Sequence, residues 1–416
     1  MTKDMTEGAI PSLLVGFTIP LVLGNLFQLL YNAVDSMIVG KFVGETALAA
    51  VGTSSPLMTL AILFISGMCM GAGVLMGMHY GAKDYDVLER QISSTMIGGL
   101  MFSVLLSAVC VFLTPWLLRL IRTQEEVLPI ATGYLRIIFC GLIFTFIYNF
   151  YASTLRALGD SRSPLYFLMI SAALNVAGDL FFVVVLGWGS NGCAFSTVLS
   201  EALCCLLCGL YIKKKVKILC LGRKWRVFDR RLFYKTVQFG WVSAMQQATV
   251  QLGKIGIQAI VNTMGISVMA AFAVVNRIDD FAYTPEQNIA HAMTALLAQN
   301  KGAGKKERIR EGFRCGLWIE MIYALFICVV CFVFARPLMK LFVTDVAILA
   351  AVRLLPSEGF ALVTAMVLQA LSLSFVMQNM RPVLNLTYAS RIANGVSLFR
   401  RRFRLLAMIS LLFFMF

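Results

Sequence analysis

The sequence GETALAAVG at residues 44–52 aligns with GISVMAAFA at residues 265–273, at an offset of 221 residues. At the same offset, and without a gap, YGAKDYDVLER at 80–90 matches KGAGKKERIRE at 301–311. Membrane segments can resemble one another by composition alone, but here one register holds through a loop, a hydrophobic span and the next loop. The repeat therefore predicts two similar halves, which in membrane proteins commonly move against each other around a central site.

The composition is that of a protein embedded in a lipid bilayer. Of its 416 residues, 59% are hydrophobic and only 14% are charged. The apolar residues fall in runs of about 20 or more, which are long enough to cross a bilayer as helices. Because backbone groups in lipid must find hydrogen bonds within their own segment, these runs predict helices rather than an open sheet. The expected class is an all-α polytopic membrane protein.

The apolar spans fall into two sets that are separated by a basic connector at residues 213–236. The first set lies in residues 1–212 and predicts an N-terminal six-helix bundle, whereas the second lies in 237–416 and predicts a C-terminal bundle. The predicted spans are 13–40, 46–78, 91–118, 130–152, 164–186, 190–212, 237–263, 268–299, 313–336, 346–376 and 383–399.

The end of the chain departs from the repeat after about residue 391. Arginines interrupt a segment that the repeat would make apolar, and the apolar run that follows them is too short to span a bilayer. We expect the last helix to be shortened or altered, and a missing helix or a tail at the membrane interface are the alternatives. The interrupting residues are Arg400, Arg401, Arg402 and Arg404.

The net charge of +15 indicates membrane topology rather than nucleic-acid binding. Lys and Arg gather in short loops, chiefly at 213–217, 223–226 and 301–314. A cytoplasmic N-terminus puts most of these loops in the cytoplasm, which agrees with the positive-inside rule. Most of the 11 cysteines lie inside apolar runs, where they behave as small hydrophobic residues. We therefore expect neither a disulfide framework nor a resident metal or other cofactor.

Two carboxylates lie inside the predicted spans, where each costs roughly 2.5–3.5 kcal/mol on insertion scales. Asp35 is in the first span, and Asp179 is deep in the fifth with Asn175 one turn before it on the same face. Thr197 in the sixth span can approach from the adjacent helix. Either acid alone could be a helix-end carboxylate that reaches water, but together the four predict one oxygen-rich pocket. Such a pocket suits Na+ through its hard oxygen ligands, or a proton because neighbouring carboxylates hold one more tightly.

Other polar residues suggest a cavity between the halves. Pro20 breaks the hydrogen-bond ladder of the first span and is a candidate hinge, with a static kink as the alternative. Lys254 lies near the middle of the seventh span, too deep to reach the interface easily. Further candidates, each of which could instead bond a neighbouring helix, are Gln28, Tyr31, Tyr148, Asn149, Gln246 and Gln247.

Several motifs together resemble the multidrug and toxic compound extrusion (MATE) family. They are IPLVLGNLFQLLYNAVDSMIVGKFVGETALAAVG, LRALGDSRSPL, LNVAGDLFF, MQQATVQLG, IQAIVNTMGISVMAAFAVVNRID and QNKGAGKKERI, and they occur in the family's order. The resemblance covers roughly residues 8–391. It implies two bundles of six helices related by a pseudo-twofold, and a monomer in a bacterial plasma membrane. It also implies export of cationic, amphipathic compounds by alternating access in exchange for Na+ or H+.

The resemblance also implies a coupling site in the N-terminal bundle, and Asp35, Asn175, Asp179 and Thr197 match that site of related members one for one. Some branches of the family place coupling acids in the seventh and tenth helices. Here the seventh predicted span has no acid, and the tenth offers only Glu358. A coupling site in the second half is therefore not expected.

Other functions remain open at the level of sequence. A flippase for lipid-linked sugars, from the same superfamily, would need a strongly basic cavity, and the first half shows no arginine cluster within its spans. An intramembrane enzyme would need a catalytic constellation, but the two histidines fit no HExxH pattern. A membrane protein without transport activity is the last alternative. The favoured prediction is a non-enzymatic antiporter for small molecules.

Overall fold

The computed structural model describes residues 4–121, 123–216, 227–261 and 266–342, and every element in these ranges is a helix. The helices from α1 to α6, with η1 continuing α5, are long and apolar enough to cross a membrane. The elements are α1 (Ile10–Phe42), α2 (Glu45–Gly81), α3 (Tyr85–Leu120), α4 (Leu128–Ala157), α5 (Arg162–Asp179), η1 (Leu180–Val185), α6 (Gly189–Lys215), α7 (Arg230–Val261), α8 (Ile266–Gly302) and α9 (Lys306–Phe342).

Each predicted span as far as residue 336 overlaps with one of these helices, α5 and η1 together for the fifth, but the limits differ by up to seven residues. Helix α6 ends at Lys215 and α7 begins at Arg230, so both helices reach into the predicted connector. The spans predicted at 346–376 and 383–399, and the altered segment after residue 391, lie outside the described residues. The predicted bundle boundaries therefore stay predictions.

The internal repeat reappears in the helix boundaries. Helix α2 begins at Glu45 and ends at Gly81, and α8 begins and ends 221 residues later in each case. Helices α3 and α9 begin at the same offset. The turns between them also match, because Lys83 has a φ of 58° and its counterpart Gly304 has a φ of 70°. The two halves therefore share their local backbone as well as their hydrophobic pattern.

Lys83 is strained in a way that its counterpart avoids. A left-handed backbone costs a side-chain-bearing residue about 1–2 kcal/mol, whereas glycine adopts it freely but loses more entropy on folding. We expect Lys83→Gly to raise the free energy of unfolding by about 0.5–1 kcal/mol after both effects. The measurement is thermal unfolding of the detergent-solubilised protein. Lys83→Ala removes the charge and keeps the strain, so a Lys83→Ala variant as stable as Lys83→Gly would contradict this explanation.

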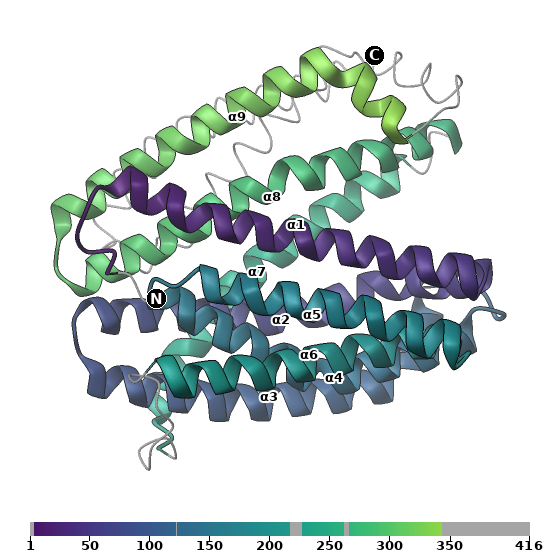
Figure 1. The fold of residues 1–416 in the computed structure, drawn as a ribbon, viewed down its shortest axis with the longest axis horizontal. Coiled ribbons are helices and arrows are strands. Elements are labelled where there is room, and N and C mark those ends of the chain that lie inside the picture. The colour runs from purple at the N-terminus through teal and green to yellow at the C-terminus, as the bar shows by residue number, and fades with distance from the viewer. Residues whose placement is uncertain (1–3, 122, 217–226, 262–265, 343–416) are drawn as a thin grey trace.

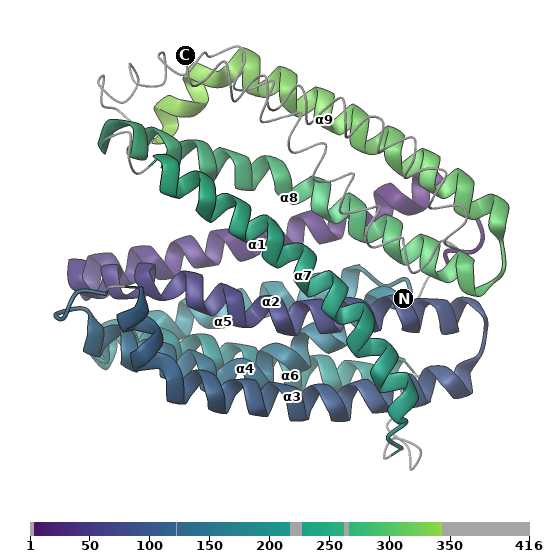
Figure 2. The same cartoon turned by 180° about the vertical axis from the view of Figure 1, so that it is seen from behind.

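Four helices, α1, α2, α7 and α8, form most of the described contact between the halves. Helix α1 lies between α5 of its own half and α8 of the other, and α2 packs against both α7 and α8 (Figure 1). Seen from behind, α7 runs obliquely across α2 toward α3 (Figure 2). Small residues allow this close approach, because a Cβ at Gly71 of α2 would collide with the backbone of Gly240 in α7. The junction is thus made by backbone-to-backbone packing of first-half helices on second-half helices.

Candidate ion site and central cavity

A cavity of about 520 Å³ lies between α1, α2, α4, α5, α6, α7 and α8. Its walls are apolar for the most part, with amide, hydroxyl and charged groups set among them. This mixture suits organic molecules, which need apolar contact and a few polar groups that fix their orientation. The polar side chains that line it include Asn25, Gln28, Asn149, Arg156, Glu201, Gln287, Asn288 and His291.

The structure places most of the predicted cavity residues at this wall. The lining includes Pro20, Gln28, Tyr31, Tyr148, Asn149 and Gln247. The side chains of Gln246 and Lys254 lie outside the described part of the chain. Among the lining residues, Asn149 donates a hydrogen bond of 2.8 Å to the Thr145 carbonyl, and Tyr148 donates one of 3.4 Å to the Pro164 carbonyl. The roles of these residues in binding a transported molecule stay predictions.

The four residues predicted as an ion site lie together at the junction of α1, α5 and α6. Asp35 and Asp179 face each other, with ligand atoms of both and of Cys193 within 4.8 Å of one another. Asn175 Nδ2 donates a hydrogen bond of 3.2 Å to Thr197 Oγ1. Asp179 is 0% exposed and Asn175 is 2% exposed, whereas Asp35 and Thr197 line the cavity. The site is therefore buried behind the cavity wall but borders on it.

Several buried oxygens of this site have no hydrogen-bond partner among the described residues. They are Asp35 Oδ1, Asn175 Oδ1 and both carboxylate oxygens of Asp179. A buried oxygen without a partner costs free energy, and two facing carboxylates repel each other when both are ionised. A proton shared by the carboxylates, or a Na+ among the free oxygens, would remove both penalties. The residues present therefore fit either ion.

Local sequence explains how α5 presents this site. Gly178 lies against α6, where a Cβ would collide with Ser196 Oγ. Ser196 Oγ in turn donates a hydrogen bond of 2.8 Å to the Asn175 carbonyl. Directly after Asp179 the helix widens into the π-helical η1, a rare geometry that is frequent at functional sites. The small residue and the serine thus hold Asn175 and Asp179 against α6.

Cys193 was not predicted as part of the site. Cysteine inside an apolar run is usually a small hydrophobic residue, and nothing in its sequence position distinguished it. Its sulfur is a poor ligand for Na+, which prefers oxygen. It therefore contributes volume and a weak donor beside the two carboxylates, and the described cysteines are free thiols.

Two charged residues in the cavity wall, Glu201 and Arg156, were also not predicted from the sequence. Glu201 lies on α6 one turn after Thr197 and accepts a hydrogen bond of 2.6 Å from Thr145 Oγ1. A charge inside the bilayer is costly to insert, and Asp179 was predicted as a site residue for that reason. The same criterion applies to Glu201 and would have identified it. Arg156 was assigned to a loop because the predicted span ended at residue 152, whereas α4 continues to Ala157.

Arg156 belongs to the sequence LRALGDSRSPL at residues 155–165, which contains the end of α4 and the start of α5. Gly159 has a φ of 83°, which glycine adopts without strain and which ends α4. Asp160 then accepts hydrogen bonds from the backbone N–H groups of Arg162 and Ser163 at 3.1 and 3.0 Å. These bonds satisfy donors at the start of α5 that have no partner within the helix. The motif thereby fixes the last turn of α4, from which Arg156 extends.

The two halves meet in a closed seal at the end of the bundle that carries the α2–α3 and α8–α9 turns. A Cβ at Gly81 would collide with the carbonyl of Gln299, and one at Gly302 with the carbonyl of Met78. These contacts exchange under the 221-residue repeat, so they are a pair related by the pseudo-twofold. Gln299 also donates a hydrogen bond of 2.8 Å to the Ala157 carbonyl.

The N-terminal segment lies across this seal. Met5 is 1% exposed, and its N–H donates a hydrogen bond of 2.9 Å to Gln299 Oε1. Asn300 Nδ2 donates to the Met5 carbonyl at 3.1 Å, and Lys305 Nζ donates to the Thr6 carbonyl at 2.8 Å. The first residues of one half thus bind the turn of the other.

This contact changes the pKa of Asp4. Partial burial raises the pKa of its carboxyl, but hydrogen bonds from Thr6 and the positive charges of Lys305 and Lys83 outweigh it, so that the pKa is lowered. Asp4 is therefore ionised at neutral pH and favours the position of the N-terminal segment between these lysines.

Comparisons with known proteins agree with this architecture. The sequence pattern of the family described as MatE matches residues 20–181 and 243–398. The chain is 31% identical over 338 residues to the "Probable multidrug resistance protein YoeA" of Bacillus subtilis, covering 79% of this chain and 73% of that protein. It is 30% identical over 344 residues to the "Probable multidrug resistance protein YpnP" of the same organism, covering 82% and 76%.

The fold also matches solved structures. One is described as the outward-facing conformation of a multidrug resistance MATE family transporter of the MOP superfamily. It has a TM-score of 0.83 at 21% identity, covering 91% of this chain and 84% of that one. This match confirms the predicted helical membrane fold of two bundles. With the family pattern on both halves, the chain belongs to the MatE family, that of the multidrug and toxic compound extrusion transporters.

Proposed function

We propose that this protein exports amphipathic small molecules, cationic ones among them, across the bacterial plasma membrane in exchange for Na+ or H+. The observation that carries the proposal is the pair of facing carboxylates, Asp35 and Asp179, whose unsatisfied oxygens adjoin an organic-sized cavity. An ion that enters through the cavity reaches Asp35 first, because this residue lines it. The names of the relatives, multidrug resistance proteins, support the same substrate class.

Helix α1 connects the ion site to the contact between the halves. It carries Asp35, packs on α5 of its own half and packs on α8 of the other. Neutralisation of the carboxylate pair by an ion removes their repulsion and lets α1 approach α5 and α6. Pro20, which lines the cavity on the same helix, is our candidate hinge for this movement. The driving force is adequate, since a proton gains about 1.4 kcal/mol per pH unit.

The seal at Gly81 and Gly302 determines to which side of the membrane the cavity can open in this conformation. With the N-terminus in the cytoplasm, as the charge distribution predicts, the seal closes the cytoplasmic end of the cavity. The described conformation then corresponds to the outward-facing state, and transport requires that α2 and α8 separate at these glycines. We propose that the monomer alternates between this state and one in which the seal is open.

Reconstituted protein tests the coupling. Proteoliposomes are loaded with a fluorescent cationic dye, and Na+ and pH gradients are imposed separately. We expect one gradient to stimulate dye transport at least tenfold in the wild type, and Asp179→Asn to lose this stimulation because it cannot share a proton or ligate a cation as a carboxylate does. Glu125→Gln, an exposed acid in the α3–α4 connection, is the matched control. Undiminished stimulation in Asp179→Asn would contradict the proposed ion site. Transport that does not respond to either gradient would contradict the proposed antiport.

The flippase alternative is less favoured by the cavity. Its described lining contains one arginine, Arg156, and one histidine, His291, together with the acids Asp35 and Glu201. A diphosphate head group carries more than one negative charge and would be repelled by the two acids. The same proteoliposomes test the alternative that this is a membrane protein without transport activity, because such a protein would move no dye under any gradient.

A further inference from the structure

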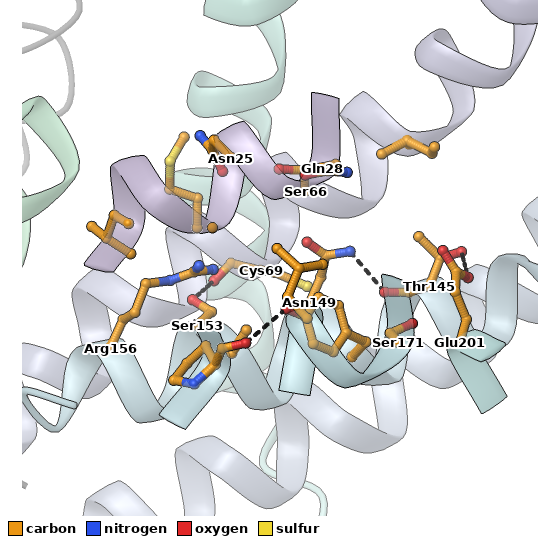
Figure 3. Close-up of a pocket in the computed structure, with 18 of the residues that line it drawn as sticks. Asn25, Gln28, Ser66, Cys69, Thr145, Asn149, Ser153, Arg156, Ser171 and Glu201 are labelled. Carbon is orange, nitrogen blue, oxygen red and sulfur yellow. Dashed lines mark hydrogen bonds between the residues drawn. The ribbon is translucent and has the colours of Figure 1, made fainter. Parts of the chain in front are cut away.

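The cavity carries opposite charges at two separate levels. Figure 3 shows Arg156 near one end of the group of lining residues and Glu201 near the other, with Ser153 and Asn149 between them. Arg156 extends from the last turn of α4, and Glu201 is held by the hydroxyl of Thr145, also on α4. The wall is therefore electrostatically bipolar along the direction of α4.

The spacing of the two charges follows from helix geometry. Thr145, Asn149, Ser153 and Arg156 all line the cavity, as residues three and four apart on one face of a helix do. The eleven steps along the chain from Thr145 to Arg156 make about three turns, which rise about 16 Å at 1.5 Å per residue. Because both side chains are long and can lean toward each other, a molecule whose charges lie less than about 16 Å apart would contact both.

Neither charge has an ionic partner among the residues that the structure describes. Among the residues that the structure describes, no acid lies within salt-bridge distance of Arg156 and no basic residue within that distance of Glu201. Thr145 donates to one oxygen of Glu201, which leaves the other available. A charged group that lies within a membrane span normally has a partner or faces a site of function, so both groups call for an opposite charge from elsewhere.

Polar groups around Arg156 suit an oxyanion. His291 of α8 lies near enough to interact electrostatically with Arg156, and Asn288 lines the cavity one turn earlier on α8. Asn25 of α1 donates a hydrogen bond of 3.4 Å to Asn288 Oδ1, which fixes the orientation of that amide. Guanidinium groups recognise carboxylates and phosphates through paired hydrogen bonds, and amides can add further donors.

We propose that the preferred substrates of this cavity are amphipathic zwitterions, with a carboxylate or phosphate bound at Arg156 and an amine or other cationic group at Glu201. The inference rests on the proposed export function and names its substrate class. It assigns Glu201 to the substrate and leaves Asp35 and Asp179 to the coupling ion. A purely cationic compound still binds through Glu201, but Arg156 then has no counter-charge and repels it.

A matched pair of dyes tests the assignment at equilibrium, without any gradient. Rhodamine B is a zwitterion at neutral pH, and its ethyl ester keeps the rings and the cationic charge but has no carboxylate. Binding to the purified full-length protein in detergent is followed by fluorescence anisotropy. Because partition of each dye into detergent is the same for every variant, the ratio of the two Kd values is compared between variants.

We expect the wild type to bind rhodamine B at least tenfold more tightly than the ester. Arg156→Gln is expected to reduce this preference to about one, whereas Arg156→Lys, which keeps the positive charge, retains most of it. Glu201→Gln is expected to weaken both dyes by similar factors of about ten, since both carry the cation. All variants are first shown to be monodisperse by size-exclusion chromatography.

Several results would overturn the proposal. One is a wild type that does not bind rhodamine B or does not prefer it to the ester, and another is an Arg156→Gln variant that keeps the preference. Asp179→Asn serves to separate this proposal from the coupling mechanism, because it should lose gradient-driven transport and keep the dye preference. If the wild type prefers rhodamine B to its ester but shows no gradient-driven transport, the proposed substrate class is supported and the proposed antiport is contradicted.

Discussion

Valine in place of Gly302 is expected to abolish transport, with a loss of at least a hundredfold in the gradient-driven rate. A Cβ at this position would occupy the space of the Met78 carbonyl, which belongs to the backbone of α2. Backbone cannot move aside as a flexible side chain can, so α2 and α8 could not close in the described conformation. Gly81→Val is expected to do the same, because the pseudo-twofold places it against the Gln299 carbonyl.

The expected defect is conformational, and hydrogen–deuterium exchange can observe it directly. In Gly302→Val, peptides that cover residues 4–8 and 299–308 should exchange faster, because the hydrogen bonds between them form only in the closed seal. Gly16→Val is the matched control, since a Cβ there meets open space and the residue is exposed. Transport by Gly302→Val at the rate of the Gly16→Val control would show that the seal plays no part in the cycle.

Asparagine at Asp35 and at Asp179, singly and together, should give three variants with the same defect. Each single change is expected to reduce the gradient stimulation of transport by tenfold or more, and the double change should reduce it no further. The reason is that, in our proposal, the facing carboxylates hold one ion between them, and residues that act as a unit lose their effect together. Initial rates of dye transport, with and without the active gradient, measure the effect.

Equilibrium dye binding is the control for this series, because it reports a folded cavity without coupling. All three variants should bind rhodamine B within about threefold of the wild type. A single variant that keeps its stimulation, or a double variant that loses much more than either single change, would mean that the two acids act at separate ion sites.

The cluster of residues at the candidate ion site was predictable from sequence for a physical reason. Asn175 and Asp179 are four residues apart on one helix, so their common face is fixed by helical periodicity. A carboxylate inside an apolar span is costly and rare, which distinguished Asp35 and Asp179 from the many polar residues near helix ends. Thr197 was placed only by adjacency of spans and by resemblance to the family, and its contact with Asn175 required the packing of α5 on α6.

Arg156 and Glu201, the charged residues that we propose bind the substrate, were not predicted from the sequence. Glu201 met the criterion of a buried charge and was overlooked, whereas Arg156 could not be recognised, because the end of α4 depends on the Gly159 turn and not on hydrophobicity. Cys193 carries no signal at all, since its position beside two carboxylates results from the crossing of α5 and α6.

The sequence alone determined the class, the positions of the described spans though not their limits, and the duplication, because these depend on hydrophobic runs, turn glycines and a register that each half carries locally. Tertiary structure decided which faces meet. Gly81 and Gly302 are ordinary helix-terminal glycines in the sequence, and they form a seal only because α2 and α8 cross there with their backbones in contact. Arg156 and Glu201 likewise become two ends of one cavity only when α4 and α6 pack around it, since long-range contacts between helices are set by three-dimensional packing and leave no periodic trace in the chain.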